Sequence, residues 1–167
     1  MVVYVALTAY RRLYMLSDEL INCFKDTFQI SIYTRVSYNT NYSIKSNKVY
    51  MEGFVSTQKR KEEHAVINIC SGTTFSIVRN YLQYGRVAVL NFANPVIPGG
   101  GVGNGAMAQE ECLCRSSNLY ACISASNVYE EYYGYHRNLK NYFYSDRLIY
   151  TKDVTVFKND NATRILV

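Results

Sequence analysis

Residues Val87 to Ser117 read VAVLNFANPVIPGGGVGNGAMAQEECLCRSS, and this stretch decides the expected fold. It begins with an apolar run, Val87 to Leu90, which is typical of a strand buried on both faces of a parallel sheet. Pro95 and Pro98 then prevent a sheet or helix from continuing. Five glycines follow within seven residues: Gly99, Gly100, Gly101, Gly103 and Gly105. Ala106 to Glu111 is rich in good helix formers. A strand, a glycine loop and a helix in this order form an arrangement that binds phosphate, because glycine lets backbone N–H groups approach an anion.

The residues before this stretch predict a second strand and a helix. Val66 to Cys70 is again apolar, and the Ser-Gly-Thr-Thr sequence that follows it supplies a helix N-cap. Phe75, Val78 and Leu82 then follow at helical spacing, and Gly85 is expected just past the helix end. A strand, a helix and a strand within about 25 residues form a βαβ unit with parallel strands. The sequence therefore predicts an α/β fold.

The N-terminal part of the chain carries weaker signals. Val2 to Leu7 suits a strand or a buried arm. Ser17 to Phe28 has an apolar stripe at helical spacing, with Ser17 as N-cap. Ile30 to Val36 alternates as a strand would, and Asn39 to Ser46 is polar and is predicted to be a loop.

Beyond the glycines, one helix is predicted from about Met107 to Ser124. Tyr129 to Tyr144 is aromatic and polar, is broken by Gly134, and is predicted to be irregular or partly helical. Two short strands are expected at Asp146 to Tyr150 and Val154 to Phe157, joined by a three-residue connection.

Composition restricts the class of protein. The chain has 167 residues, 49% of them hydrophobic, which indicates one globular domain. No apolar run reaches the roughly 18 residues of a membrane span, and the N-terminus lacks the basic start of a signal peptide. A cytoplasmic or nucleocytoplasmic location fits these features. The net charge of +5 would attract a polyanion, although Glu62 and Glu63 offset the cluster Lys59-Arg60-Lys61.

Cysteines and histidines are expected to play no part in the chemistry. The five cysteines are an odd number without a framework, which favours free thiols in a reducing compartment. Cys112 and Cys114 would lie on different faces of a helix, so a shared zinc ion is not expected. His64 and His136 stand among charged and polar residues and are predicted to lie at the surface.

Glu110 and Glu111 are the candidate chemical groups. Acidic residues in the first turn of a helix often only complement the helix dipole. Here, however, an adjacent pair of carboxylates follows a loop that can bind phosphate. The sequence Gly101 to Ala106 also matches the dinucleotide fingerprint G-x-G-x-x-A, but the prolines separate it from the strand, so the required tight turn is absent. A P-loop is excluded because no Gly-Lys-Ser/Thr ends the loop.

The spacing of three glycines, seven residues and then Gln109-Glu110-Glu111 resembles the signature of poly(ADP-ribose) glycohydrolases, and closely that of the microbial type, a branch of the macrodomain fold. The words NFANP, AQEECLCRSSNLY and YSDRLIY…DVTVFK resemble that family too, and the resemblance runs from about Lys45 to Asp160. It implies a macrodomain-like three-layer α/β/α fold with a mostly parallel mixed sheet. Residues 48–167 would form the catalytic domain, incomplete at its C-terminus, and residues 1–47 an accessory region.

The resemblance also implies an activity, the hydrolysis of ribose–ribose O-glycosidic bonds in poly(ADP-ribose) with release of ADP-ribose. Glu111 would protonate the leaving hydroxyl and then help to activate water, and Glu110 would hold the ribose hydroxyls. Asn94 would contact the scissile ribose, and Gln109 would support the turn. The backbone N–H groups of three glycines would wrap the diphosphate: Gly99, Gly100 and Gly101.

No metal or cofactor is implied, since the carboxylate moves the proton and the loop supplies the electrostatics. The expected partner is poly(ADP-ribose) or an ADP-ribosylated protein, with no direct binding to nucleic acid or membrane. Domains of the family continue beyond the point that corresponds to Val167, with further strands, a second diphosphate loop and an aromatic residue that stacks on adenine. The alternative is therefore a non-catalytic ADP-ribose-binding module, or an inactive truncated remnant of the family.

Overall fold

The computed structural model describes residues 7–8, 17–57, 66–139, 143–159 and 164–165. The chain divides into two compact units. The first combines residues up to Tyr14 with Val55–Asn91, and the second combines Met15–Phe54 with Phe92–Val167. The glycine loop and the glutamate pair belong to the second unit. The predicted features at Val2 to Ala6, at Lys59 to Lys61 and at His64 lie outside the described residues.

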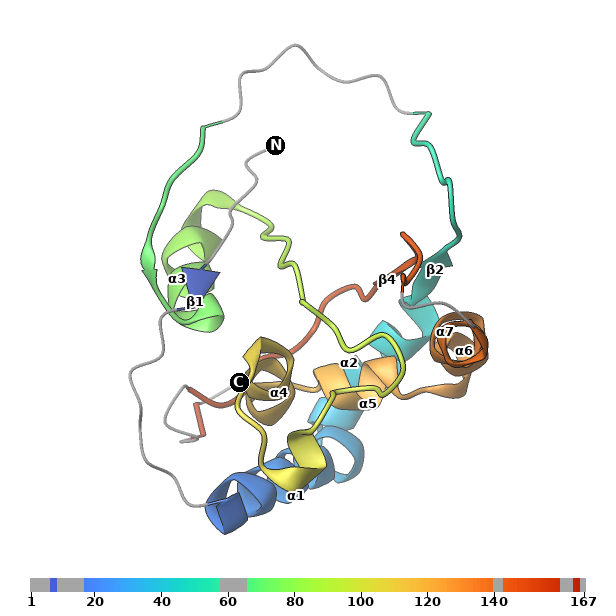
Figure 1. The fold of residues 1–167 in the computed structure, drawn as a ribbon. Coiled ribbons are helices and arrows are strands. Elements are labelled where there is room, and N and C mark those ends of the chain that lie inside the picture. Colours follow the sequence, from blue (N-terminus) through green and yellow to red (C-terminus); the bar gives the residue numbers. More distant parts are fainter. Residues whose placement is uncertain (1–6, 9–16, 58–65, 140–142, 160–163, 166–167) are drawn as a thin grey trace. The chain divides into compact units, whose positions relative to one another are not determined.

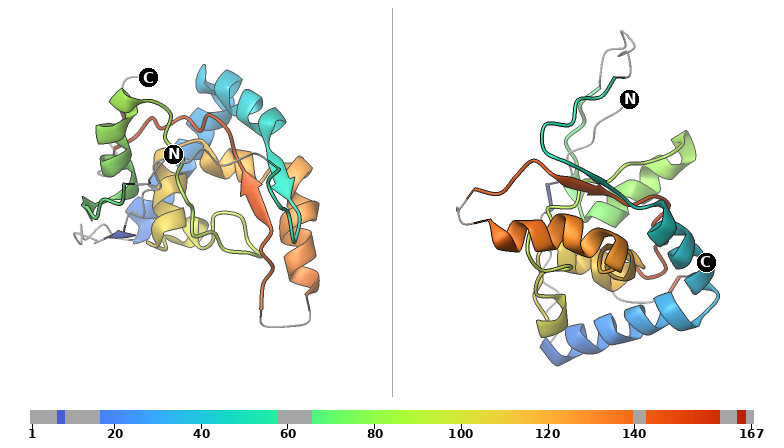
Figure 2. Two further views of the ribbon diagram at one scale, coloured as in Figure 1. Left: turned by 90° about the horizontal axis from the view of Figure 1, so that it is seen from above. Right: turned by 90° about the vertical axis from the view of Figure 1, so that its right-hand side faces the viewer.

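The second unit is mainly helical (Figure 1). Its helices are α1 (Ser17–Tyr33), α2 (Val36–Ser46), the 3-10 helix η2 (Val102–Asn104), α4 (Gln109–Ser116), α5 (Leu119–Ile123), α6 (Ser126–Val128), the π-helix η3 (Tyr129–Gly134) and α7 (Tyr135–Asn138). Two strands lie in the described part of this unit, β2 (Lys48–Tyr50) and β4 (Leu148–Tyr150), and they pair antiparallel and lie side by side in Figure 2.

Helix α1 begins at Ser17, as predicted, but the strand expected at Ile30 to Val36 and the loop expected at Asn39 to Ser46 are wrong. Helix α1 continues to Tyr33, and α2 fills the next segment. Two of the polar residues that suggested a loop, Thr40 and Ser43, are buried, and the Thr40 hydroxyl donates to the Val36 carbonyl one turn earlier at 3.1 Å. Tertiary burial of one helix face outweighs weak helix propensity here.

The single helix predicted from Met107 to Ser124 is interrupted at Ser117 and Asn118. The C-terminal segment docks against this break. The Asn118 N–H donates to the Thr155 carbonyl at 3.1 Å, and the Thr155 N–H donates to the Asn118 Oδ1 at 2.9 Å. An isolated antiparallel bridge joins Ser117 and Val156, and no full strand forms at Val154 to Phe157. Backbone groups that would continue the helix therefore bind the C-terminal segment instead.

Two predictions for the C-terminal half are confirmed. The segment from Tyr129 to Tyr144 is partly helical through η3 and α7. The strand expected at Asp146 to Tyr150 is present as β4, with Leu148 opposite Tyr50 and Tyr150 opposite Lys48.

The first unit contains β1 (Leu7–Thr8), β3 (Ser71–Gly72), α3 (Thr74–Tyr81) and the 3-10 helix η1 (Leu82–Tyr84). Strands β1 and β3 pair in parallel. The predicted helix is confirmed: the Ser76 N–H donates to the Oγ1 of the N-cap Thr73 at 3.1 Å, and Gly85 follows the helical segment with a φ of 132°.

The two apolar runs of this unit are not strands, which is a correction. Neither Val66 to Cys70 nor Val87 to Leu90 pairs with a described strand, and most of their large side chains are exposed. An apolar run becomes a strand only when a neighbour binds its backbone groups. The described residues therefore contain one parallel and one antiparallel two-stranded sheet, and the mostly parallel sheet is not found among them.

Candidate active site

The side chain of Glu110 turns back from the first turn of α4 to the loop before it. Its Oε2 accepts the Asn94 N–H at 2.7 Å, and its Oε1 accepts the Gly99 N–H at 3.2 Å. The residue is 3% exposed. Two backbone donors to one carboxylate, at the positive end of a helix, stabilise a buried negative charge that would otherwise be costly.

Glu111 is bound in a similar way but through only one oxygen. Its Oε1 accepts the Gly101 N–H at 2.9 Å. Its Oε2 is buried and has no hydrogen-bond partner among the described residues. A buried acceptor without a partner is rare in folded proteins. This oxygen is thus ready to accept a hydrogen bond from a ligand, or to carry a proton and donate it.

Gln109 extends the pattern by one residue. Its Oε1 accepts the Phe92 N–H at 2.7 Å, so three consecutive side chains of α4 bind backbone N–H groups of the segment from Phe92 to Gly101. The prediction that Gln109 supports the turn agrees with this contact. The N-cap residue Ala108 makes no side-chain cap, because alanine has no hydrogen-bonding group in its side chain.

The glycines are required to bring the loop this close to the carboxylates. Gly100 has a φ of 54°, and a Cβ there would stand 2.5 Å from the Glu111 Oε1. Gly99 has a φ of 69°, and its Cβ would stand 2.7 Å from the Tyr120 Cδ2. Other residues rarely adopt these angles, and no side chain fits the space. The N–H groups of all three glycines donate within the protein, that of Gly100 to the Ile97 carbonyl at 3.0 Å. The predicted diphosphate contact would require at least one of them to exchange a protein acceptor for a phosphate oxygen.

Asn94 begins the turn that contains Pro95, Val96 and Ile97. Its Oδ1 accepts the N–H groups of Val96 and Ile97, both at 2.9 Å, while its own N–H donates to Glu110. This Asx-type turn is a common role for asparagine. Asn94 therefore orients both the loop and one carboxylate, and its predicted contact with the scissile ribose stays a prediction.

Three buried side chains near Glu110 were missed by the sequence analysis. Burial and the negative charge of Glu110 raise the pKa of Tyr132, of Tyr133 and, with a further contribution from Glu111, of the Cys114 thiol. The Tyr133 hydroxyl is buried without a hydrogen-bond partner among the described residues. Cys114 and Tyr133 are wholly buried, and they keep water away from this side of the carboxylate. The available signal was the helical spacing of Cys114 from the glutamates.

His136 corrects a prediction, because it is buried and not at the surface. Its Nδ1 lies 2.7 Å from the Tyr132 carbonyl and its Nε2 lies 2.8 Å from the Ser145 Oγ. The Tyr132 ring packs on it edge to face. The imidazole thus holds the aromatic segment in place, and no contact joins it to the carboxylates.

Helix α1 supports the glycine loop through the ring of Tyr120. The rings of Phe24 and Phe28 pack edge to face on Tyr120, with centroids 4.8 Å and 5.5 Å away, and Tyr120 in turn fills the space beside Gly99. The Ser17 Oγ lies 3.4 Å from the Asn104 carbonyl. The N-terminal region, expected to be accessory, thus contacts the loop directly.

The described residues offer no metal centre: no group of three or more His, Cys, Asp or Glu side chains there has a suitable geometry. All five cysteines are free thiols. No described helix combines the length and the apolarity needed to cross a bilayer.

Comparison with known proteins identifies the relatives of this site. Residues 19–159 match the model of the microbial-type PARG catalytic domain, where PARG is poly(ADP-ribose) glycohydrolase. The structure is similar to that of PARG from Thermomonospora curvata, with a TM-score of 0.73 and 27% identity over 89% of this chain and 60% of that one. The same enzyme bound to the inhibitor ADP-HPD matches with a TM-score of 0.71, 28% identity and coverage of 89% and 58%.

PARG from Deinococcus radiodurans in complex with ADP-ribose also matches, with a TM-score of 0.61, 27% identity and coverage of 75% of this chain and 52% of that one. The chain thus spans about 60% of the length of the Thermomonospora structure. No curated protein sequence matches it.

Proposed function

Because the chain belongs to the family of microbial-type PARG catalytic domains, we propose that it takes part in hydrolysing the ribose–ribose O-glycosidic bonds of poly(ADP-ribose), with release of ADP-ribose. The observation that carries the proposal is the arrangement of the carboxylates. The glycine loop holds both by backbone N–H groups and leaves the buried Glu111 Oε2 without a partner in the described chain.

In this proposal Glu111 is the acid of the reaction. Its Oε1 is fixed by the Gly101 N–H, so the side chain cannot rotate away, and Oε2 presents the proton to the leaving ribose oxygen. As the glycosidic bond breaks, the sugar passes through an oxocarbenium-like state, and the same carboxylate then accepts a proton from the attacking water. Proton donor and acceptor are thus one group, which returns to its starting state.

Glu110 holds the substrate and does not exchange the proton. Both of its oxygens are bound by backbone N–H groups and it is almost wholly buried, so it remains a fixed acceptor for ribose hydroxyls and a negative charge beside the developing cation. Asn94 and Gln109 fix the loop against this carboxylate. Since the N–H groups of Gly99 and Gly101 bind the carboxylates, the loop acts first by positioning these two side chains.

The substrate is proposed from the ligands of the solved relatives, which are the inhibitor ADP-HPD and ADP-ribose. A reducing compartment is proposed from the five free thiols, which lack any disulfide.

Substitution of Glu111 by glutamine tests the proposal. Glu111→Gln keeps the shape of the side chain and its contact with the Gly101 N–H but cannot supply the acidic proton. We expect release of ADP-ribose from automodified polymerase to fall by a factor of about 10² to 10⁴, with ADP-ribose affinity nearly unchanged. Glu110→Gln should weaken affinity and rate together. The matched control is Glu131→Gln, which changes an exposed glutamate on η3 and should leave the rate unchanged.

Two results would contradict the proposal. Full activity of Glu111→Gln would exclude this residue as the acid. Binding of ADP-ribose by the unsubstituted chain, measured by calorimetry, without any release from the polymer would instead establish the alternative, a binding module without catalysis.

A further inference from the structure

Helix α2 has two faces of different character. Its inner stripe, Val36, Thr40 and Ser43, is buried. The Thr40 Oγ1 accepts the Asn118 Nδ2 at 3.1 Å, and the Ser43 Oγ donates to the Asp153 carbonyl at 3.0 Å. These contacts fix the rotation of the helix about its axis. The opposite stripe is therefore held outward in one orientation.

The outer stripe carries Tyr38, Tyr42 and Lys45 at positions i, i+4 and i+7, which share one helix face. All three are exposed, Tyr38 to 80%. Large aromatic side chains at this exposure bury little apolar area, so their presence is not explained by the packing of the chain.

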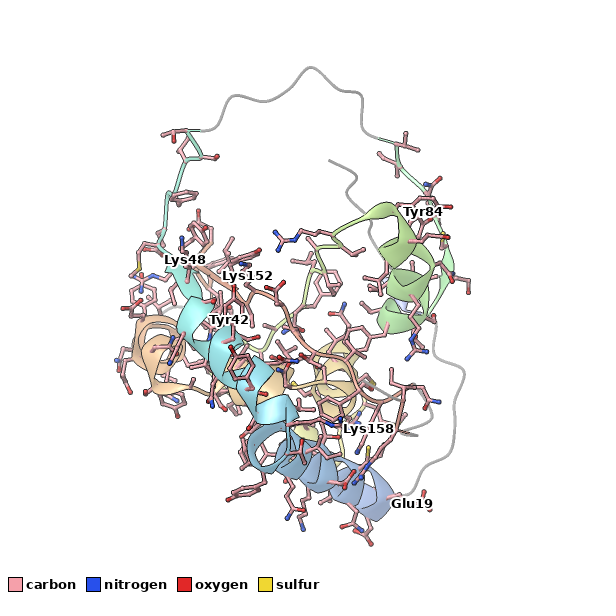
Figure 3. All side chains as sticks on the ribbon, turned by 180° about the vertical axis from the view of Figure 1, so that it is seen from behind. Glu19, Tyr42, Lys48, Tyr84, Lys152 and Lys158 are labelled. Carbon is pink, nitrogen blue, oxygen red and sulfur yellow. The ribbon has the colours of Figure 1, made fainter. Side chains whose placement is uncertain are left out.

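The paired strands extend this stripe. Lys48 on β2 lies opposite Tyr150 on β4, and both side chains are exposed on the same face of the pair. Two residues beyond Tyr150, the Lys152 Nζ donates to the Tyr42 hydroxyl at 2.9 Å and lies 5.4 Å from the centroid of its ring. Figure 3 shows Tyr42, Lys48 and Lys152 on one side of the molecule. The tyrosine–lysine patch consists of Tyr38, Tyr42, Lys45, Lys48, Tyr150 and Lys152.

The chemistry of the patch suits a flexible polyanion that contains aromatic bases. Tyrosine faces stack on bases of any sequence, and lysines bind the phosphates between them. The Asp153 carboxylate, 3.8 Å from the Lys152 Nζ, offsets one of the three positive charges, so the patch keeps a net positive charge. A chain of ADP-ribose units carries an adenine and a diphosphate at each repeat, so successive units can stack bases on the stripe and place phosphates beside the lysines.

We propose that the tyrosine–lysine patch is a second binding site for the poly(ADP-ribose) chain, separate from the two carboxylates. The identity of the polymer rests on the proposed function. The patch lies on one face of α2. The opposite face of α2 contacts Asn118, which follows the C-terminal end of α4, through Thr40. It binds units of the chain that are not being cleaved, and so raises the affinity for long polymer over a single unit. The hydrogen bond and the charge of Lys152 lower the pKa of Tyr42, which agrees with a preformed pair.

Direct binding to polymer tests the patch. All variants carry Glu111→Gln, so that the polymer is not consumed, and fluorescence anisotropy measures binding to labelled long poly(ADP-ribose) and to labelled ADP-ribose. Replacing Tyr38 and Tyr42 together by serine should weaken binding of the polymer at least tenfold, because the bases lose the two aromatic rings on which they stack. Replacing Lys45 and Lys48 by glutamine should lower the slope of log K against log salt by about 1.4. Binding of ADP-ribose should not change in either variant.

A matched control removes one exposed tyrosine and one exposed lysine elsewhere, Tyr84→Ser with Lys25→Gln, and should bind the polymer as the parent does. The proposal is overturned if the patch variants bind polymer as tightly as this control. It is also overturned if they lose ADP-ribose binding equally, or if single-stranded poly(A) binds the patch as tightly as poly(ADP-ribose). If the patch variants lose polymer binding while the chain with Glu111 restored releases no ADP-ribose, the patch stands and the hydrolase proposal fails.

Discussion

The loop before α4 forms hydrogen bonds with residues nearby in the sequence, whereas the apolar runs at residues 66–70 and 87–90 pair with no described strand. In the loop, backbone N–H groups of Asn94, Gly99 and Gly101 reach carboxylates that lie only 10 to 16 residues away in the sequence, and those carboxylates are buried. In the runs, side chains such as Ile67 and Ile69 are largely exposed and no described strand pairs with them. Local contacts thus build the loop, whereas the runs would need partners from farther away.

The loop is therefore stabilised by contacts within its own stretch of sequence, whereas the apolar runs are not. A loop closed over about a dozen residues loses little chain entropy, and charge-assisted hydrogen bonds offset that loss. A strand forms no inter-strand backbone hydrogen bonds until a second strand is aligned beside it.

Truncation of the α4 core should have the largest effect. Leu113 is 3% exposed on the same helix as the two glutamates. Leu113→Ala should lower the free energy of unfolding by about 2 to 5 kcal/mol, because it removes buried methyl groups and leaves a cavity. Urea denaturation followed by circular dichroism measures this. A loss below about 0.5 kcal/mol would mean that α4 does not organise the folded unit.

A methyl group on the loop should disable the site itself. Gly100→Ala places a Cβ 2.5 Å from the Glu111 Oε1 at a φ of 54°, so the carboxylate must shift. We expect ADP-ribose release to fall by about 10²-fold, as misplacement of a catalytic group by about 1 Å does. Gly103→Ala is the matched control, since its Cβ would meet nothing within 4 Å. Equal activity of the two variants would show that the close approach is not required.

The ion pair at the C-terminal end of the second unit should contribute less. The Lys158 Nζ is buried and lies 2.7 Å from the Asp26 Oδ2, and Arg164 binds the other oxygen at 2.6 Å. Burial raises the pKa of Asp26, but the hydrogen bonds and charges of Lys158 and Arg164 outweigh it and lower the pKa below its ordinary value. Its contribution to stability is therefore present above the unfolded-state pKa of about 4 and is lost as the pH falls through the folded-state value.

Asp26→Asn should lower the free energy of unfolding by about 1.5 kcal/mol at pH 7, the low end for a charged hydrogen bond, since Asp26 is partly exposed. The difference from the unsubstituted chain should shrink in urea melts below about pH 4. Asp18→Asn, an exposed change on the same helix, should cost about 0.3 kcal/mol. A difference for Asp26→Asn that is constant from pH 7 to pH 3 would rule out the ion pair as its cause.

A substitution in the apolar run Val66 to Cys70 should change the free energy of unfolding least. Ile69 is 88% exposed, so Ile69→Thr should change the free energy of unfolding by no more than about 0.5 kcal/mol. Urea denaturation checks this beside Leu113→Ala. A loss of about 2 kcal/mol or more would show that the run is buried in solution, and the contrast between the two regions would then disappear.

The contacts among the candidate site residues could be anticipated from the sequence because their signals are local. Two adjacent glutamates, a glycine run with the right spacing and an asparagine directly before a proline each describe contacts within a short stretch, and the structure brings all of them together. The same reasoning failed for Ile30 to Val36 and for Asn39 to Ser46, where alternation and polarity suggested a strand and a loop. In the second of these segments, contacts of Thr40 and Ser43 with the distant residues Asn118 and Asp153 stabilise helix α2.

The glycine loop, the two carboxylates at the start of α4, and the helices at Ser17 and Thr74 could be predicted from the amino-acid sequence, because their caps, turns and spacing are properties of neighbouring residues. The folded structure was needed to show that the N–H groups of Gly99 and Gly101 bind the carboxylates, that Tyr133 and His136 are buried, and that Tyr42 meets Lys152. The physical reason is distance along the chain. Burial and cross-element hydrogen bonds join residues as far apart as 138 positions, and no local pattern records which of them will meet.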